Sequence, residues 1–138
     1  MLLAILLSAC TEGGPEDTGR LPISNETDSA SGTYHLEARF TPDPPVAGDQ
    51  DLELVMTWNA EDDLIDGALV AGATLTATLT APDARDAPAL HPAFVETSLG
   101  SYEASFTWSA AGYWVLTLGI GDLDQDGSAL MAFEVATP

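Results

Sequence analysis

The side chains that could bind a metal ion are few and widely spaced along the sequence. There are two histidines, His35 and His91, one cysteine, Cys10, and three methionines. Imidazole, thiolate and thioether groups bind transition metals, whereas carboxylates and carbonyl oxygens suit calcium and magnesium. His35 lies on the polar phase of an alternating segment and is expected to be exposed. Met56 and Met131 lie on apolar phases, which favours packing in the core over a role as ligands.

Alternating acidic residues near the C-terminus resemble the first half of an EF-hand calcium loop. They are Asp122, Asp124 and Asp126, followed by Gly127, which permits a sharp turn. An EF-hand also needs a bidentate acid at its twelfth position, where this sequence has Phe133. The run joins two predicted strands rather than two helices. A calcium site and a solvated acidic hairpin therefore both stay open.

A second acidic cluster comprises residues 61–63 and Asp66, which precedes Gly67 in a turn-forming pair. A solvated loop is the favoured interpretation, and a weak divalent-cation site is the alternative. The 22 acidic residues include no pair that the spacing singles out for acid–base chemistry. The sequence also contains no lysine and no G-x-S-x-G nucleophile elbow. We therefore expect that the protein is not an enzyme.

The charge balance restricts the partners. Twenty-two Asp and Glu residues stand against 3 Arg, for a formal net charge of −19. Binding to nucleic acid needs clustered Lys and Arg to neutralise phosphates. Electrostatic docking on an anionic membrane needs the same side chains. Nucleic acid and charge-driven docking on a membrane are therefore excluded, whereas cations and basic protein surfaces remain.

The first ten residues, MLLAILLSAC, form an apolar run that ends in small residues and Cys10. The run is shorter than the roughly 20 residues that cross a bilayer, so it reads as a secretory leader. Residues 7–10 resemble the lipobox of bacterial lipoproteins, which implies a signal peptide over residues 1–9 and a lipidated Cys10. The protein would then be anchored in the bacterial cell envelope. Thr11, in place of the Asp that retains lipoproteins at the inner membrane, favours the outer membrane, facing the periplasm or the cell surface. An ordinary secretory leader is the alternative.

Residues 10–32 are rich in Gly, Ser, Thr, Pro and acid, which predicts a flexible linker after the lipidated cysteine. From Thr33 onward, apolar and polar residues alternate, which is typical of half-buried strands. The strands are expected over residues 33–41, 51–58, 73–81, 94–97, 101–108, 113–120 and 129–135. About seven strands joined by turn-forming pairs predict an all-β, immunoglobulin-like antiparallel β-sandwich over residues 33–138. Without a cysteine in that range, aromatic packing in the core must replace an inter-sheet disulfide, by Trp58, Trp108, Trp114, Phe106 and Phe133.

The stretch from Leu52 to Val135 resembles the YtkA-like domain family, small immunoglobulin-like modules outside the cytoplasm. The resemblance rests on Pro45-Val46-Ala47-Gly48, on the run DGALVAGA before a threonine-rich strand, and on GSYEASF followed by AGYWVLTL. Members of the family often carry a loop with Met and His before the short strand, which implies copper handling. His91 fits the histidine of that loop. Ala and Leu replace the methionines, which removes the thioethers that favour Cu(I).

These observations favour a lipid-anchored envelope protein with a non-catalytic binding or accessory module. Its partner would be the membrane, through the anchor, and an envelope protein, with the ligand unknown. The alternative is a metal-handling periplasmic domain. In that case copper would bind through His91, or calcium through the loop of Asp122, Asp124 and Asp126.

Overall fold

The computed structural model describes residues 20–59 and 66–138. The described chain is all-β, with eight strands in two antiparallel sheets. The strands are β1 (Glu26–Asp28), β2 (Tyr34–Thr41), β3 (Gly48–Trp58), β4 (Thr74–Thr80), β5 (Val95–Ser98), β6 (Ser101–Trp108), β7 (Gly112–Gly121) and β8 (Gly127–Val135). Among the residues described, no helix is long and apolar enough to span a membrane.

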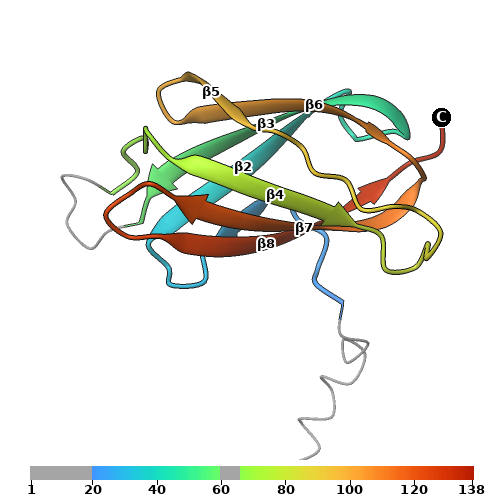
Figure 1. Ribbon diagram of the computed structural model, residues 1–138, viewed down its shortest axis with the longest axis horizontal. Helices are drawn as coiled ribbons and strands as arrows, with labels where there is room; N and C mark the ends of the chain where they lie inside the picture. The colour runs from blue at the N-terminus through green and yellow to red at the C-terminus, as the bar shows by residue number, and fades with distance from the viewer. Residues whose placement is uncertain (1–19, 60–65) are drawn as a thin grey trace, which may run out of the picture.

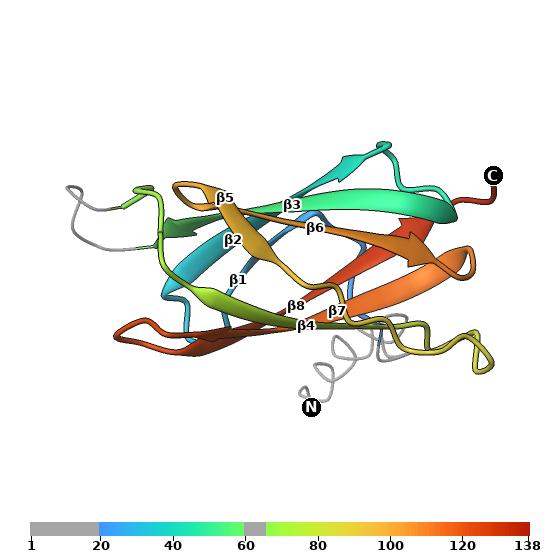
Figure 2. The same cartoon turned by 45° about the horizontal axis from the view of Figure 1, so that its top comes forward.

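The two sheets form a β-sandwich, as the alternating pattern predicts. One sheet has the strand order β1-β2-β3-β6-β5, and the other has the order β4-β7-β8. Figure 2 shows the sandwich close to edge-on, with β3 and β6 in the upper layer and β4, β7 and β8 in the lower one. The seven predicted strands are all present within a few residues of their expected bounds. An immunoglobulin-like sandwich fits this arrangement.

The prediction of a flexible linker over residues 10–32 is wrong for its last part. Residues 26–28 form β1, which pairs with β2 from Glu26↔Glu37 to Asp28↔His35. The flanking residues bind the other sheet, through Ser24 N to Ala132 O (3.1 Å) and Ala30 N to Ser128 O (2.7 Å). Composition failed here because backbone hydrogen bonds, rather than buried apolar side chains, order this segment. Residues 10–19, including Cys10, lie outside the described part.

A second segment, residues 90–98, also passes from one sheet to the other. Leu90 exchanges two backbone hydrogen bonds with Leu79 of β4, at 2.8 and 2.9 Å. A few residues later the same segment forms β5, which pairs with β6. In Figure 1 this segment runs from β5 across the end of β4. Residues 20–30 and 90–98 therefore link the two sheets along two sides of the sandwich and leave its outer faces open.

Aromatic side chains fill one end of the core, as expected for a sandwich without a disulfide. Trp114 is fully buried, and its ring centroid lies 5.3 Å from that of Trp108. Phe40 packs edge-on against Phe133 at 4.8 Å. The first pair is tilted, with 55° between the ring planes, and the second has the edge-to-face geometry that aromatic pairs prefer. The two internal methionines are also core residues, since Met56 and Met131 are 0% and 3% exposed.

The two outer faces differ in chemistry because the outward positions of their strands differ. On the three-stranded sheet these positions carry mainly uncharged residues, including the four threonines of β4. On the five-stranded sheet they carry most of the strand carboxylates. They are Glu26, Asp28, Glu37, Asp49, Asp51, Glu53 and Glu103. The acidic face of the five-stranded sheet is therefore where a cation would be attracted.

Candidate functional site

Serine and threonine hydroxyls of β6 hold three carboxylates of β3 in place on the acidic face. Antiparallel pairing sets each acid beside a residue of β6. Ser105 Oγ donates to Asp51 Oδ1 at 2.6 Å, and Thr107 Oγ1 donates to Asp49 Oδ1 at 3.0 Å. Ser101 Oγ donates to Glu53 in the same way. These carboxylates therefore keep ordered positions although they face water.

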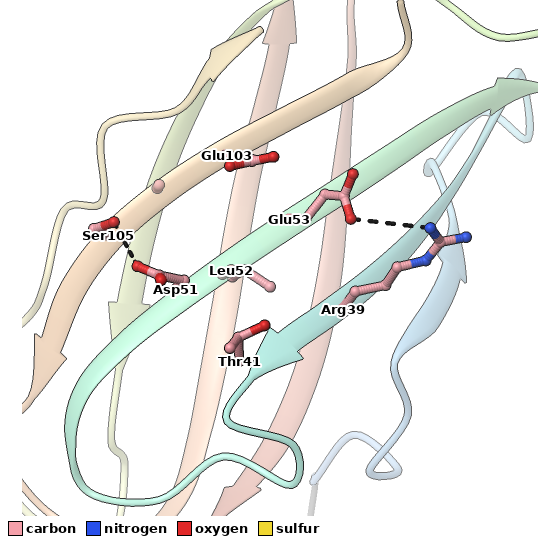
Figure 3. Close-up of a pocket in the computed structure, with 8 residues that line it drawn as sticks. Arg39, Thr41, Asp51, Leu52, Glu53, Glu103 and Ser105 are labelled. Atoms are coloured by element: carbon pink, nitrogen blue, oxygen red, sulfur yellow. Dashed lines mark hydrogen bonds and ion pairs between the residues drawn. The ribbon is translucent and has the colours of Figure 1, made fainter. Parts of the chain in front are cut away.

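A shallow hollow of about 190 Å³ lies in the middle of this face (Figure 3). Arg39 borders it and forms ion pairs with Glu37, 3.3 Å away, and with Glu53, 3.9 Å away. Glu53 and Glu103 face each other in the register of β3 and β6, so two like charges lie side by side. Like charges directly opposite across strands repel each other and are destabilising. Because the two carboxylates lie so close together, negative potential is concentrated at the hollow.

His35 lies at the edge of the acidic face, between two carboxylates of β1. Its Nδ1 is 2.9 Å from Asp28 Oδ1, and its Nε2 is 3.2 Å from Glu26 Oε1. Asn59, just after β3, donates from Nδ2 to the same Asp28 Oδ1 at 2.8 Å. An imidazole, a carboxylate and a carboxamide therefore meet at one oxygen atom, and a second carboxylate lies on the far side of the ring.

The electrostatics of these groups follow from their contacts. The hydrogen bond with Asp28 raises the pKa of His35, and the bond with Glu26 raises it further. The hydrogen bonds from His35 and Asn59 lower the pKa of Asp28. Each partner thus favours the charged form of the other, as expected for a paired acid and base.

The alternating pattern predicts correctly that His35 points outward, but it misses the partners of this residue. Asp28 and Glu26 lie in the segment predicted to be a linker, for which no contact with His35 is expected. A signal is present nevertheless. Glu26 and Asp28 have the i, i+2 spacing that puts both side chains on one face of a strand.

The two ring nitrogens of His35 face different carboxylates. A single ion bound at Nδ1 would therefore meet Asp28 and Asn59 but not Glu26. In agreement, no three His, Cys, Asp or Glu side chains of residues 20–59 and 66–138 converge on one point that suits a metal ion. The cluster can supply one imidazole nitrogen, one carboxylate and one amide oxygen, with water completing the coordination. That donor set fits Cu²⁺ or Zn²⁺ rather than Cu⁺.

His91 lies elsewhere, on the segment that pairs with β4. It is exposed, and its Nδ1 lies 3.5 Å from Thr78 Oγ1. Met56 and Met131 are sealed in the core and present no thioether to it. The structure therefore brings none of the methionines that we considered to His91, and a copper site there stays a prediction.

The acidic run of residues 122–126 forms the hairpin between β7 and β8, as expected. Asp122 has a φ of 64° and accepts a hydrogen bond from Thr74 Oγ1. Tyr34 donates from its hydroxyl to Gln125 O at 2.6 Å, within the same hairpin. Burial raises the pKa of Tyr34, and the charges of Asp126 and Asp124 raise it further. A calcium site on this loop stays a prediction.

The second acidic cluster lies mostly outside the described part, since residues 61–63 are not described and Asp66 follows that gap.

Comparisons with known proteins give structural neighbours only. No protein-family model matches the chain, and no curated protein matches it in sequence. Solved structures do match over most of its length. FetP from a uropathogenic Escherichia coli strain, recombinantly expressed in the periplasm of E. coli, has a TM-score of 0.59 and 14% identity over 84% of this chain and 95% of its own. A copper-bound variant of FetP has a TM-score of 0.57 at 14% identity, covering 83% and 95% of the two chains.

A DUF4426 family protein from Pseudomonas aeruginosa has a TM-score of 0.54 at 12% identity, covering 76% of this chain and 92% of its own. At such identities the likeness establishes the β-sandwich fold and nothing finer. The resemblance to YtkA-like domains stays a prediction.

Proposed function

We propose that this chain is a metal-handling domain of the bacterial cell envelope that binds a divalent transition metal, Cu²⁺ first, at His35. The observation that carries the proposal is the placement of His35 between Asp28 and Glu26, with Asn59 bound to the same Asp28 oxygen. Loss of one ring proton leaves a nitrogen lone pair beside a fixed carboxylate. A set of nitrogen and oxygen ligands of this kind suits Cu²⁺.

The donor set decides the oxidation state of the metal. In the described residues neither histidine has a thiol or thioether beside it, so nothing there favours Cu⁺. Nitrogen and oxygen ligands bind Cu²⁺ more tightly than the other divalent ions of the first transition row. Asn59 would contribute its Oδ1 after the amide group flips by half a turn. This flip exchanges Oδ1 and Nδ2, which occupy nearly the same space.

The acidic face supports the proposal through its charge. A surface lined by one sign of charge raises the local concentration of counter-ions and their rate of arrival. The carboxylates of β3 are held by β6 hydroxyls and lie on the same face as His35. Cations in solution would therefore be drawn to this face before they reach the imidazole. When bound, the metal supplies a positive charge that replaces the proton shared by His35 and its partners.

The likeness to copper-bound FetP supports the same assignment at the level of the fold. Residues 7–10 support an anchor at Cys10, and the absence of a nucleophile motif supports a role without catalysis. We therefore propose a lipid-anchored, non-enzymatic protein of the envelope, with the outer membrane as its location.

Isothermal titration of the full chain with CuCl₂ tests the metal site, with His35→Ala and His91→Ala as matched variants. We expect one Cu²⁺ to bind the wild type and His91→Ala equally. His35→Ala should lose at least about tenfold in affinity. Electron paramagnetic resonance should show nitrogen coupling from one imidazole, and this coupling should vanish in His35→Ala.

Asp28→Asn keeps the shape of the site and should weaken binding with His35 intact. Binding that survives in His35→Ala and disappears in His91→Ala would move copper to the segment beside β4. Absence of any Cu²⁺ binding to the wild type would end the metal proposal.

For the anchor, Cys10→Ala should release the protein from membranes into the soluble fraction, and continued membrane retention would contradict lipidation.

A further inference from the structure

Exposed aliphatic side chains gather at one corner of the five-stranded sheet. Leu69 is 44% exposed, and Val95 and Leu99 are each 62% exposed. Single exposed aliphatics are ordinary on protein surfaces, but a contiguous group marks an interaction site. We name Leu69, Val95 and Leu99 the β5 corner.

Strand pairing brings Leu69 against the turn of Leu99 and Gly100 although these residues are far apart in sequence, and Val95 lies further along the same hairpin. Leu69 pairs with Thr57 of β3, beyond the end of β6. A Cβ added to Gly100 would lie 2.8 Å from the side chain of Leu69, so the turn of Leu99 and Gly100 touches Leu69. Val95 begins β5, the other arm of that hairpin, and lies opposite Glu103. In Figure 2 the β5–β6 hairpin ends beside the segment that precedes β4.

β5 also leaves one edge of the sheet open. It is the last strand in the order β1-β2-β3-β6-β5, and all four of its residues are exposed. Across residues 20–59 and 66–138, no backbone hydrogen bond joins β5 to a strand other than β6. An open edge is a template on which an extended segment can add as a further strand.

Carboxylates surround the corner and are held in position. Glu96 accepts the backbone N–H of Gly72 at 3.0 Å and that of Gly100 at 3.3 Å. Glu103 accepts a hydrogen bond from Thr97 at 3.1 Å and lies next to Glu53 across the strands. The corner therefore combines apolar anchors, an open edge and fixed negative charge.

We infer that the β5 corner binds an extended basic segment of a partner protein, which adds as a strand along the outer edge of β5. The segment would alternate apolar side chains, for Val95 and Leu99, with Lys or Arg, for Glu96 on the opposite face of β5. A second copy of this chain is the wrong occupant, because self-pairing would bring the carboxylates of two β5 corners together. The net charge of −19 opposes it further. This inference is independent of the metal site at His35.

Peptide binding to the full chain, free of metal, tests the inference. The probe is an extended peptide of about eight residues that alternates lysine and valine. Two controls alternate glutamate with valine, or lysine with glycine. Amide chemical-shift changes should concentrate at residues 95–100 and at Leu69 with the Lys/Val peptide only. Val95→Asn and Leu99→Asn should each weaken its binding about tenfold or more.

Leu130→Asn is the matched control, since Leu130 is 49% exposed on the other sheet, and it should bind the peptide as the wild type does. Near-ultraviolet circular dichroism checks that each variant is folded. Equal binding of Lys/Val and Lys/Gly peptides would show charge attraction alone and overturn the inference. So would shifts spread over Asp49 and Asp51 rather than β5. Self-association of the wild type that Leu99→Asn abolishes, measured by light scattering, would replace the basic partner with a second copy.

Discussion

When its ring is protonated, His35 is a cation held between two carboxylates of β1. Its environment shows how one residue can serve both stability and binding. The proton that stabilises the contact of β1 with β2 is the proton that a metal ion must displace. Stability of the metal-free protein and affinity for Cu²⁺ should therefore change in opposite directions as pH rises.

The pH dependence of this contact has a definite sign. The carboxylate contacts of His35 raise its pKa. The contribution of His35 to the free energy of unfolding is therefore complete below pH 6.5 and is lost as pH rises through the folded-state pKa. The hydrogen bonds of Asp28 lower its pKa. The contribution of Asp28 to the free energy of unfolding is therefore present above pH 3.8 and is lost as pH falls through the folded-state pKa. The contact is exposed enough that we expect only about 0.2–1 kcal/mol.

Urea unfolding of metal-free wild type and His35→Gln measures this contribution. The difference in unfolding free energy between them should be largest between about pH 4 and 6.5 and should shrink at higher pH. A difference that stays constant from acid to alkaline pH would contradict the ion pair.

Gln50 is a buried amide, 2% exposed, that joins the core to a loop. Its Oε1 accepts Trp108 Nε1–H at 2.8 Å, and its Nε2 donates to Pro42 O at 3.2 Å. Gln50→Leu keeps the volume but leaves the indole N–H without this partner, which should cost about 1–3 kcal/mol. Thr107→Val, which removes an exposed hydrogen bond to Asp49, is the control and should cost less than about 1 kcal/mol. Thermal or urea unfolding measures both, and equal losses would contradict the role of Gln50.

At the scale of elements, the segment of residues 20–30 links the two sheets. On one side β1 pairs with β2, and on the other Ser24 and Ala30 bond to β8. Tyr113 of β7 fixes the start of the segment. Its hydroxyl accepts Leu21 N–H at 2.9 Å and donates to Leu21 O at 3.1 Å, while the Arg20 guanidinium lies 4.3 Å from the ring centroid.

Tyr113→Phe should therefore loosen this segment without opening the core. We expect faster amide hydrogen exchange at residues 21–24 and unchanged protection in β3, with a loss of about 1–3 kcal/mol for two hydrogen bonds. Tyr102→Phe is a matched control. Its hydroxyl donates to Val70 O and accepts Ala73 N–H, so that variant should loosen residues 70–73 instead. Uniform acceleration in both variants would show global destabilisation rather than a local link.

At the scale of the whole molecule, the net charge of −19 destabilises the folded state. Many of these carboxylates share one face, where Glu53 and Glu103 are directly opposed. Self-repulsion of this kind destabilises the compact state and is screened by salt. The charge therefore attracts cations and weakens the metal-free fold at the same time.

The melting temperature of the metal-free protein should rise as sodium chloride increases to about 0.5 M, where the Debye length falls below about 5 Å. Glu103→Gln should raise it at low salt and reduce its salt dependence. Asp51→Asn is the control, since the residue opposite Asp51 in β6 is Ser105 rather than a carboxylate. A melting temperature that is flat in salt would contradict the repulsion.

Local alternation in the sequence determined the strands and which residues of each strand face the core. The physical reason is that side chains of a strand alternate between its two faces, so one buried face imposes a period of two. Seven strands, the buried tryptophans 108 and 114, the buried methionines and the hairpin of residues 122–126 could all be predicted in this way. Trp58 and Phe106, also expected in the core, are partly buried against it.

Only the tertiary structure decided which polar residues meet. β1 has no apolar period and is held by backbone pairing with β2, while the flanking Ser24 and Ala30 bond to β8, so the sequence pattern placed this segment in a linker. Asp28 and Glu26 thereby reach His35, and Leu69 reaches Leu99, through pairings between distant segments. Local composition carries no information on such pairings, because cross-strand register is set by the packing of whole sheets. The residues that could do chemistry were visible in the sequence, but their partners were chosen by the fold.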